Sequence, residues 1–171
     1  MRFVLQVKSF SRRDIIVSEK QFSEAAERYL DTLYRVALNS LRVPADAEDA
    51  VQETMLRFWR TDTVFDSGEH LRNWLIRVCV NVCWDMSRSW WKRRTVSLEM
   101  CAETMFDDPA KRTLWNEVMS LPAKYRLPLY LYYYEGYSAA EVGELLGLNV
   151  STVQTRLARA RAKLKSLLEE E

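Results

Sequence analysis

Residues that interrupt helices are rare in this chain. Its 171 residues include only four Gly and four Pro, and long stretches combine Leu, Ala, Glu and Arg. These four residue types favour helices, whereas Gly and Pro end or bend them. The sequence therefore predicts an all-α protein. A hydrophobic content of 48% and a charged content of 29% are typical of a folded chain with one core or two modest cores.

Apolar residues recur at helical spacing in both halves of the chain. Helices are expected at about 18–41, 46–60, 70–92, 111–120 and 123–134. Asp46 is expected to cap the second of them, because a carboxylate accepts hydrogen bonds from the free amides of a helix start. Residues 61–69 are expected to form a loop.

The domain organisation follows from the weakest part of this pattern. Residues 95–110 have no sustained period and include Pro109, so they are expected to link two small helical domains, 18–94 and 111–168. Residues 1–17 contain FVLQV, which could form a short strand, but a single strand has no partner here. The role of this N-terminal segment stays open.

The stretch YSAAEVGELLGLNVSTVQTRLARARAKL, residues 137–164, contains two helix starts separated by a Gly. Ser138 and Glu141 have the spacing of a capping box, Gly147 permits a sharp exit, and Asn149 can cap the next helix. Apolar residues are expected to face the core at Val142, Leu145, Leu146, Val150, Val153, Leu157, Ala160 and Leu164. Two helices joined in this way form a helix-turn-helix.

The outward side of the second helix in this pair, called here the reading face, suits the major groove of DNA. It consists of Ser151, Thr152, Gln154, Thr155, Ala158 and Arg159. Small residues let the backbone approach the groove, and Gln and Arg match base edges. Arg156, Arg161 and Lys163 could contact phosphates. The alternative is a helix hairpin whose charged face is only solvated.

Two further exposed faces are expected in the first half. The helix at 46–60 places Asp49, Gln52, Glu53 and Leu56 on one side, and this docking strip combines acidic residues with an apolar one. The helix at 70–92 aligns Asn73, Arg77, Trp84, Arg88 and Trp91, with Asn81 at the edge. We call the set Asn73, Arg77, Asn81, Trp84 and Arg88 the strand-binding stripe. Trp can stack on unpaired bases while Arg neutralises phosphates. The alternatives are a solvated face for the strip, and burial of Trp84, Trp90 and Trp91 for the stripe.

Three segments together resemble a known family. They are AEDAVQETMLRFWR at 47–60, NWLIRVCVNVCWDMSR at 73–88 and LPAKYRLPLYLYYYEGYSAAEVGELLGLNVSTVQTRLARARAKL at 121–164. In this order they resemble the signatures of an extracytoplasmic-function (ECF) RNA polymerase sigma factor. The resemblance implies a sigma region 2 bundle and a sigma region 4 helix-turn-helix, and a protein that directs core polymerase to promoters and helps to open the −10 region.

The resemblance also implies roles for the three faces. The docking strip matches positions that contact the clamp coiled coil of the largest polymerase subunit, and the flap region is a second expected contact. The strand-binding stripe matches positions that melt and hold the single-stranded −10 element, with Asn81 at a flipped-out base and the 61–69 loop at the specificity loop. The reading face matches −35 contacts. Ser151 and Gln154 depart from residues that are frequent there, so the promoter sequence cannot be copied from a relative. An anti-sigma factor is an expected partner.

The remaining features predict no catalytic or metal chemistry. The net charge of +1 means that nucleic-acid contacts must be local. Cys79 and Cys83 are expected to pack in the core rather than bind zinc, and His70 has no nucleophile arranged around it. No cofactor, small-molecule substrate or enzymatic activity is therefore expected. The aromatic run at 130–137 is expected to pack in the core and turn.

The cellular location and two rival functions complete the expectations. The chain has no apolar run of 18 residues, and its first residues become charged too early for a signal peptide, so the cytoplasm is expected. Three Cys without a disulfide spacing agree with a reducing compartment. The main rival function is a stand-alone helix-turn-helix regulator, and the other is a helical adaptor without a nucleic-acid role.

Overall fold

Helices account for almost all of the chain that the computed structural model describes, which is residues 17–90 and 109–169. They are α1 (Glu19–Leu41), α2 (Pro44–Trp59), α3 (Gly68–Trp90), α5 (Pro109–Ser120), α6 (Ala123–Tyr133), α7 (Ala139–Leu146) and α8 (Val150–Glu169). No strand occurs in these described ranges, so the all-α prediction is confirmed. The FVLQV segment lies outside the described residues.

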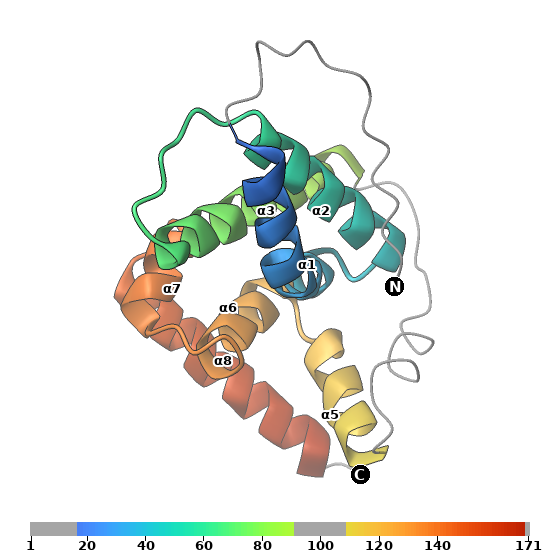
Figure 1. Ribbon diagram of the computed structural model, residues 1–171. Helices are drawn as coiled ribbons and strands as arrows, with labels where there is room; N and C mark the ends of the chain where they lie inside the picture. The colour runs from blue at the N-terminus through green and yellow to red at the C-terminus, as the bar shows by residue number, and fades with distance from the viewer. Residues whose placement is uncertain (1–16, 91–108, 170–171) are drawn as a thin grey trace.

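Helices α1, α2 and α3 pack against one another as a bundle (Figure 1). Helix α1 begins at a capping box in which the Ser18 hydroxyl accepts from the Gln21 amide at 3.2 Å. The bundle core contains Leu33, Val51, Phe58 and Leu75, all at most 2% exposed. Burial of such side chains contributes about 1.5–3 kcal/mol each, so these contacts dominate the stability of the bundle.

Helices α6, α7 and α8 form a second group, and α5 packs against α8. The core of this second group includes Leu131, Val142, Val153 and Leu157. Arg126 of α6 is also fully buried. Its guanidinium donates hydrogen bonds to the carbonyl oxygens of Met119 and Leu121 within this group, and of Asn39 in α1.

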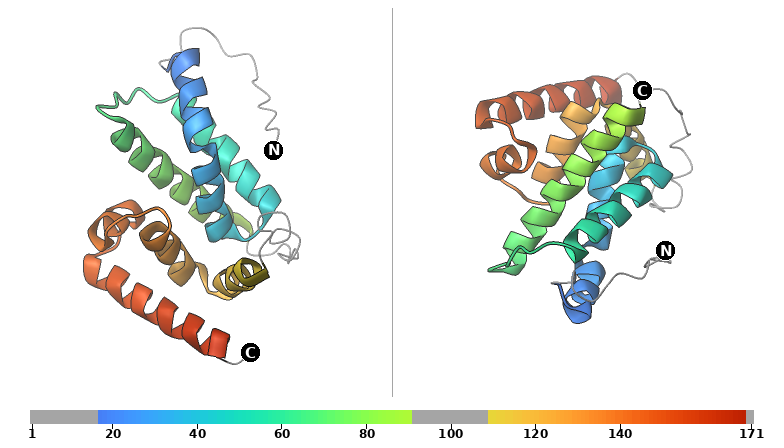
Figure 2. Two further views of the ribbon diagram at one scale, coloured as in Figure 1. Left: turned by 60° about the horizontal axis from the view of Figure 1, so that its bottom comes forward. Right: turned by 90° about the horizontal axis from the view of Figure 1, so that it is seen from above.

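The two groups of helices lie directly against each other. Figure 2 shows the bundle on one side and the C-terminal helices on the other, with α6 against α1 and α7 beside α3. The Arg35 guanidinium of α1 lies 5.0 Å from the ring centroid of Tyr134, at the end of α6. The relative placement of the two groups is therefore fixed by specific side-chain contacts, which the sequence did not indicate.

The structure corrects four expectations about individual elements. Helix α2 begins at Pro44, with Val43 as a cap that makes no side-chain hydrogen bond, so Asp46 lies in the first turn and is not the cap. Pro suits the first helical position because the amide that it lacks has no partner there. Helix α3 begins at Gly68, two residues earlier than expected. Helix α5 begins at Pro109, inside the expected linker, and residues 91–108 lie outside the described part of the chain.

The aromatic run at 130–137 is only partly buried. The prediction that it packs in the core and turn therefore holds for some of its residues and is wrong for others. Tyr130 and Tyr137 are buried, whereas Tyr132, Tyr133 and Tyr134 are 37%, 54% and 63% exposed. The three exposed rings follow one another at the C-terminal end of α6, which is open to solvent. No helix among the described residues is long and apolar enough to cross a membrane.

Candidate nucleic-acid and protein interfaces

The helix-turn-helix forms as the capping signals predicted. The Ser138 hydroxyl accepts from the Glu141 amide at 3.3 Å, and the Glu141 carboxylate accepts from the Ser138 amide at 2.7 Å. Hydrogen bonds to the Glu141 carboxylate from the Ser138 side chain and from the Ser138 backbone amide lower the pKa of Glu141, because they favour its charged form. Gly147 ends α7 with a φ of 64°, and the Asn149 side chain caps α8 by accepting from the Thr152 amide at 2.8 Å.

The tight approach of the turn to α7 depends on Gly143. A Cβ atom built on Gly143 would lie 2.6 Å from the Leu148 carbonyl oxygen, closer than such atoms come in proteins. The Leu148 amide in turn donates to the Gly143 carbonyl oxygen at 2.8 Å. Gly143 was not among the residues expected to shape the turn, although a Gly inside an amphipathic helix is itself a signal of close backbone packing.

The reading face on α8 is accessible. Ser151, Gln154, Thr155, Ala158 and Arg159 are exposed, and Thr152 is half-buried. Val153, Leu157 and Ala160 lie in the core, as expected, but Val150 does not, since 42% of it is exposed. The short side chains at the start of α8 therefore leave its first turns open to a groove, and the cationic side chains follow further along.

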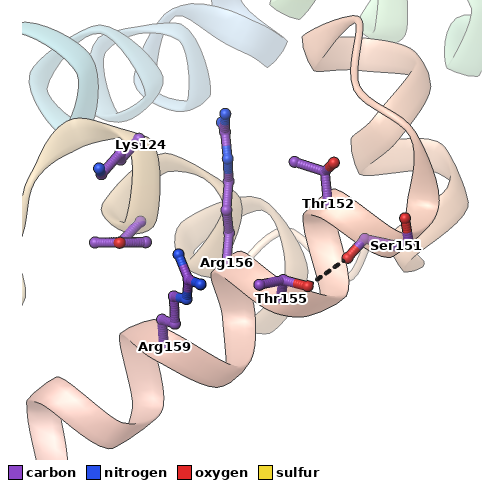
Figure 3. Close-up of a pocket in the computed structure, with 7 residues that line it drawn as sticks. Lys124, Ser151, Thr152, Thr155, Arg156 and Arg159 are labelled. Atoms are coloured by element: carbon purple, nitrogen blue, oxygen red, sulfur yellow. Dashed lines mark hydrogen bonds between the residues drawn. The ribbon is translucent and has the colours of Figure 1, made fainter.

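The reading face borders a pocket that also includes residues from α6. Besides α8 residues, the pocket is lined by Lys124 and Tyr125 at the start of α6 (Figure 3). Neither residue was among the expected contacts. Their only sequence signal was a cation followed by an aromatic residue just after Pro122, and nothing in the spacing connected them to the pocket residues of α8, which lie far along the chain at 151–159.

The docking strip is exposed on α2. Asp49, Gln52, Glu53 and Leu56 all lie on the solvent side of the bundle, opposite the buried Val51 and Phe58. The strip includes one exposed large hydrophobic residue, Leu56, at 36%. The Glu53 carboxylate accepts from the Arg57 guanidinium at 2.8 Å, and exposed pairs of this kind are weak and easily exchanged for another partner.

The strand-binding stripe runs along α3, but its residues are not equally free. Arg77, Asn81, Trp84 and Arg88 are exposed, and Trp84 is 41% exposed. Arg88 pairs with Asp85 at 2.8 Å. Asn73 is half-buried, and its side-chain oxygen accepts from the Tyr137 hydroxyl at 2.7 Å. The side chains of Trp90 and Trp91 lie outside the described residues, so their expected alternatives remain predictions.

The first half of this stripe faces the helix-turn-helix. The Arg77 guanidinium donates to the Glu144 carbonyl oxygen at 3.3 Å, and a depression between α3 and α7 is lined on one side by Arg77, Asn81 and Trp84. The opposite side is lined by residues 144–147. Next to these, Arg72 forms an ion pair with Glu135, whose side chain is only 7% exposed. Part of the proposed single-strand surface is therefore engaged within the chain.

The two described cysteines belong to the bundle core. Cys79 and Cys83 are at most 1% exposed, and the Cys79 thiol donates to the Leu33 carbonyl oxygen at 3.6 Å. Contact with Cys83 and burial raise the pKa of Cys79, which keeps the thiol protonated. Their role in packing agrees with the sequence prediction. No group of three metal-ligating side chains comes together in the part of the chain that the structure describes.

Comparison with known proteins decides the family. The model of sigma-70 region 2 matches residues 25–93, and the model of sigma-70 region 4 matches residues 111–164. The ECF RNA polymerase sigma factor SigM of Mycobacterium tuberculosis is 32% identical over 150 residues, which cover 86% of this chain and 76% of SigM. This chain belongs to the ECF sigma factors. SigW of Bacillus subtilis is 27% identical over 168 residues, covering 86% of this sigma factor and 88% of SigW.

Solved structures show the same fold. The sigma factor RpoE of Bartonella quintana, in complex with the anti-sigma factor NepR, has a TM-score of 0.69 at 23% identity, covering 88% of this sigma factor and 98% of RpoE. CnrH, in complex with the cytosolic domain of CnrY, has a TM-score of 0.66 at 27% identity, covering 90% of this chain and 91% of CnrH. The family consists of transcription initiation factors, and the stand-alone regulator is not favoured.

Proposed function

We propose that this sigma factor divides promoter recognition between two units, residues 18–94 and 111–168. The first binds core RNA polymerase through the docking strip and holds the opened −10 element on the strand-binding stripe. The second reads the −35 duplex through the reading face. The observation that carries this proposal is that one chain exposes all three faces on separate helices, α2, α3 and α8.

The docking strip suits a basic helical surface such as a clamp coiled coil. Its two carboxylates, on Asp49 and Glu53, lie one helical turn apart and beside Leu56 on the same side of α2. Charged groups at the rim guide association, whereas an apolar side chain at the centre excludes water and supplies affinity. We propose a second, weaker contact between the C-terminal unit and the flap region of polymerase.

The stripe on α3 suits a single strand rather than a duplex. Trp84 offers an exposed ring on which an unpaired base can stack, with Arg77 two turns before it and Arg88 one turn after it. Asn81 offers both a hydrogen-bond donor and an acceptor to the edge of a base. Stacking of about 1–3 kcal/mol per base offsets the few kcal/mol needed to unpair a step of the duplex.

Polymerase completes this mechanism, because neither unit needs to bind DNA tightly alone. When the two units are bound to polymerase at a fixed spacing, binding at −35 raises the effective concentration of the stripe at −10. The sigma factor takes no catalytic role in this proposal, and RNA synthesis belongs to core polymerase. It acts in the cytoplasm, where its DNA and polymerase are found, and is held in check by an anti-sigma protein.

The function is tested by measuring binding to core polymerase and initiation from promoters. The wild-type chain should bind core polymerase and, with a promoter library, direct initiation from discrete sites. Combined Asp49→Ala and Glu53→Ala substitutions should weaken this binding about tenfold, equivalent to about 1.4 kcal/mol. Glu27→Ala is the control, because Glu27 is exposed on α1 outside the docking strip.

Two results would contradict the proposal. One is a chain that does not bind core polymerase but binds duplex DNA alone, which would support a stand-alone regulator. The other is an equal loss of polymerase binding in Glu27→Ala and in the α2 variant, which would show that α2 is not the docking surface.

A further inference from the structure

The pocket beside the reading face gathers positive charge from two helices. Its lining is Lys124 and Tyr125 of α6 and Ser151, Thr152, Thr155, Arg156 and Arg159 of α8. It therefore combines three cations with four hydroxyl groups and contains no carboxylate. In Figure 3, Lys124 and Arg159 approach the same space from opposite helices. Such a lining favours an anion over a cation or an apolar ligand.

Interactions inside the pocket leave these charges available. Among the described residues, no carboxylate forms an ion pair with Lys124, Arg156 or Arg159. The Lys124 ammonium lies 5.0 Å from the centroid of the Tyr125 ring, a contact that does not neutralise its charge. A hydrogen bond from Arg159 lowers the pKa of Tyr125 and places the Tyr125 hydroxyl next to that guanidinium.

We propose that this pocket binds one backbone phosphate of the −35 duplex, with Lys124 of α6 as a positioning residue for the reading face. The inference rests on the proposed function of α8. Arg159 and Thr155 belong to both the pocket and the reading face, so a phosphate held here lies beside the bases that α8 contacts. Phosphate contacts fix the register of a recognition helix without specifying sequence. Through this phosphate, Lys124 brings α6 into contact with the DNA strand that lies beside α8.

The test uses holoenzyme assembled from core polymerase and the full chain, with a duplex chosen from the promoter library. Lys124→Gln removes one charge at the pocket, and Lys20→Gln removes one from α1, where the Lys20 side chain is 85% exposed. Lys124→Gln should weaken binding about equally for matched and altered −35 sequences. It should also reduce the slope of log K against log salt by about 1, as expected for one phosphate contact.

The outcomes separate this inference from the proposed function. If wild-type holoenzyme initiates and Lys124→Gln has the same affinity and salt slope as Lys20→Gln, the pocket does not bind a DNA phosphate. If millimolar inorganic phosphate protects the free chain from unfolding equally in both variants, a free-anion site at Lys124 is also excluded. If wild-type holoenzyme does not recognise any promoter, the proposed function itself is wrong.

Discussion

Replacement of Arg126 by Met removes the one charged residue that is completely buried, at 0% exposure, among the described residues. Its Nε atom donates to the Asn39 carbonyl oxygen at 2.6 Å, and its Nη1 atom donates to those of Met119 and Leu121 at 3.0 Å and 2.6 Å. Met fills similar space but leaves three carbonyls without this donor. An unsatisfied buried acceptor costs about 1–3 kcal/mol. The three lost bonds are therefore the destabilising part of the change in the free energy of unfolding.

Removal of the charge offsets part of this loss. Burial lowers the pKa of Arg126 to about 10, which shows that the protein interior disfavours the guanidinium charge. A shift from 12.5 to about 10 corresponds to about 3 kcal/mol of differential stabilisation between the two protonation states. The free energy of unfolding should therefore fall by about 3 kcal/mol, the balance of the two effects.

Urea unfolding followed by circular dichroism measures this difference. Arg57→Met is the matched control, because Arg57 makes only an exposed pair with Glu53 and should change the free energy of unfolding by less than about 1 kcal/mol. The reasoning is refuted if Arg126→Met is as stable as Arg57→Met, since the carbonyls around Arg126 would then need no donor. It is also refuted if the variant is more stable than wild type.

Three other changes should have defined effects. Gly143→Ala should disrupt the turn, because the new Cβ would meet the Leu148 carbonyl oxygen at 2.6 Å, and −35 duplex binding should fall more than tenfold in a gel-shift assay with holoenzyme; wild-type affinity would count against this packing argument. Trp84→Ala should slow opening of the −10 region about tenfold, measured with 2-aminopurine fluorescence, while −35 binding stays unchanged; an equal loss of both would place Trp84 in a structural role. Burial raises the pKa of Tyr137 to about 12 from 10.0. The unfolded chain loses this proton first, so the stabilisation is present below pH 10 and is lost as the pH rises to about 12; unfolding of Tyr137→Phe should show a shallower fall over that window, and an identical pH dependence would contradict the shift.

Local signals predicted the helices well because each signal acts within a few residues. The capping box at Ser138 and Glu141 and the left-handed Gly147 depend only on neighbouring backbone, so the helix-turn-helix could be read directly from residues 137–164. The docking strip was predicted from the helical periodicity of residues 46–60 alone. Where the local signals competed, at the start of α2, Pro44 at the first helical position outweighed the capping preference of Asp46.

Contacts between distant segments could not be predicted in the same way. Arg126 directly precedes the stretch LPLYLYYY at 127–134, and no pattern in the sequence marked it as a buried residue. Its partner in α1 is 87 residues away. The pocket at Lys124 and the contact between Asn73 and Tyr137 likewise arise from how α6 and α7 lie on their neighbours. No periodicity within one helix carries that information.

Permanganate footprinting of thymines in the −10 region tests the central claim most directly. Holoenzyme assembled with this sigma factor is placed on a promoter selected from the library, and core polymerase alone is the control. The proposal predicts thymines that react only with holoenzyme, at a fixed distance from the −35 element, and a loss of that reactivity with Asn81→Ala. Thymines that stay unreactive on every promoter to which the holoenzyme binds would contradict the proposed role of α3 in holding the opened strand.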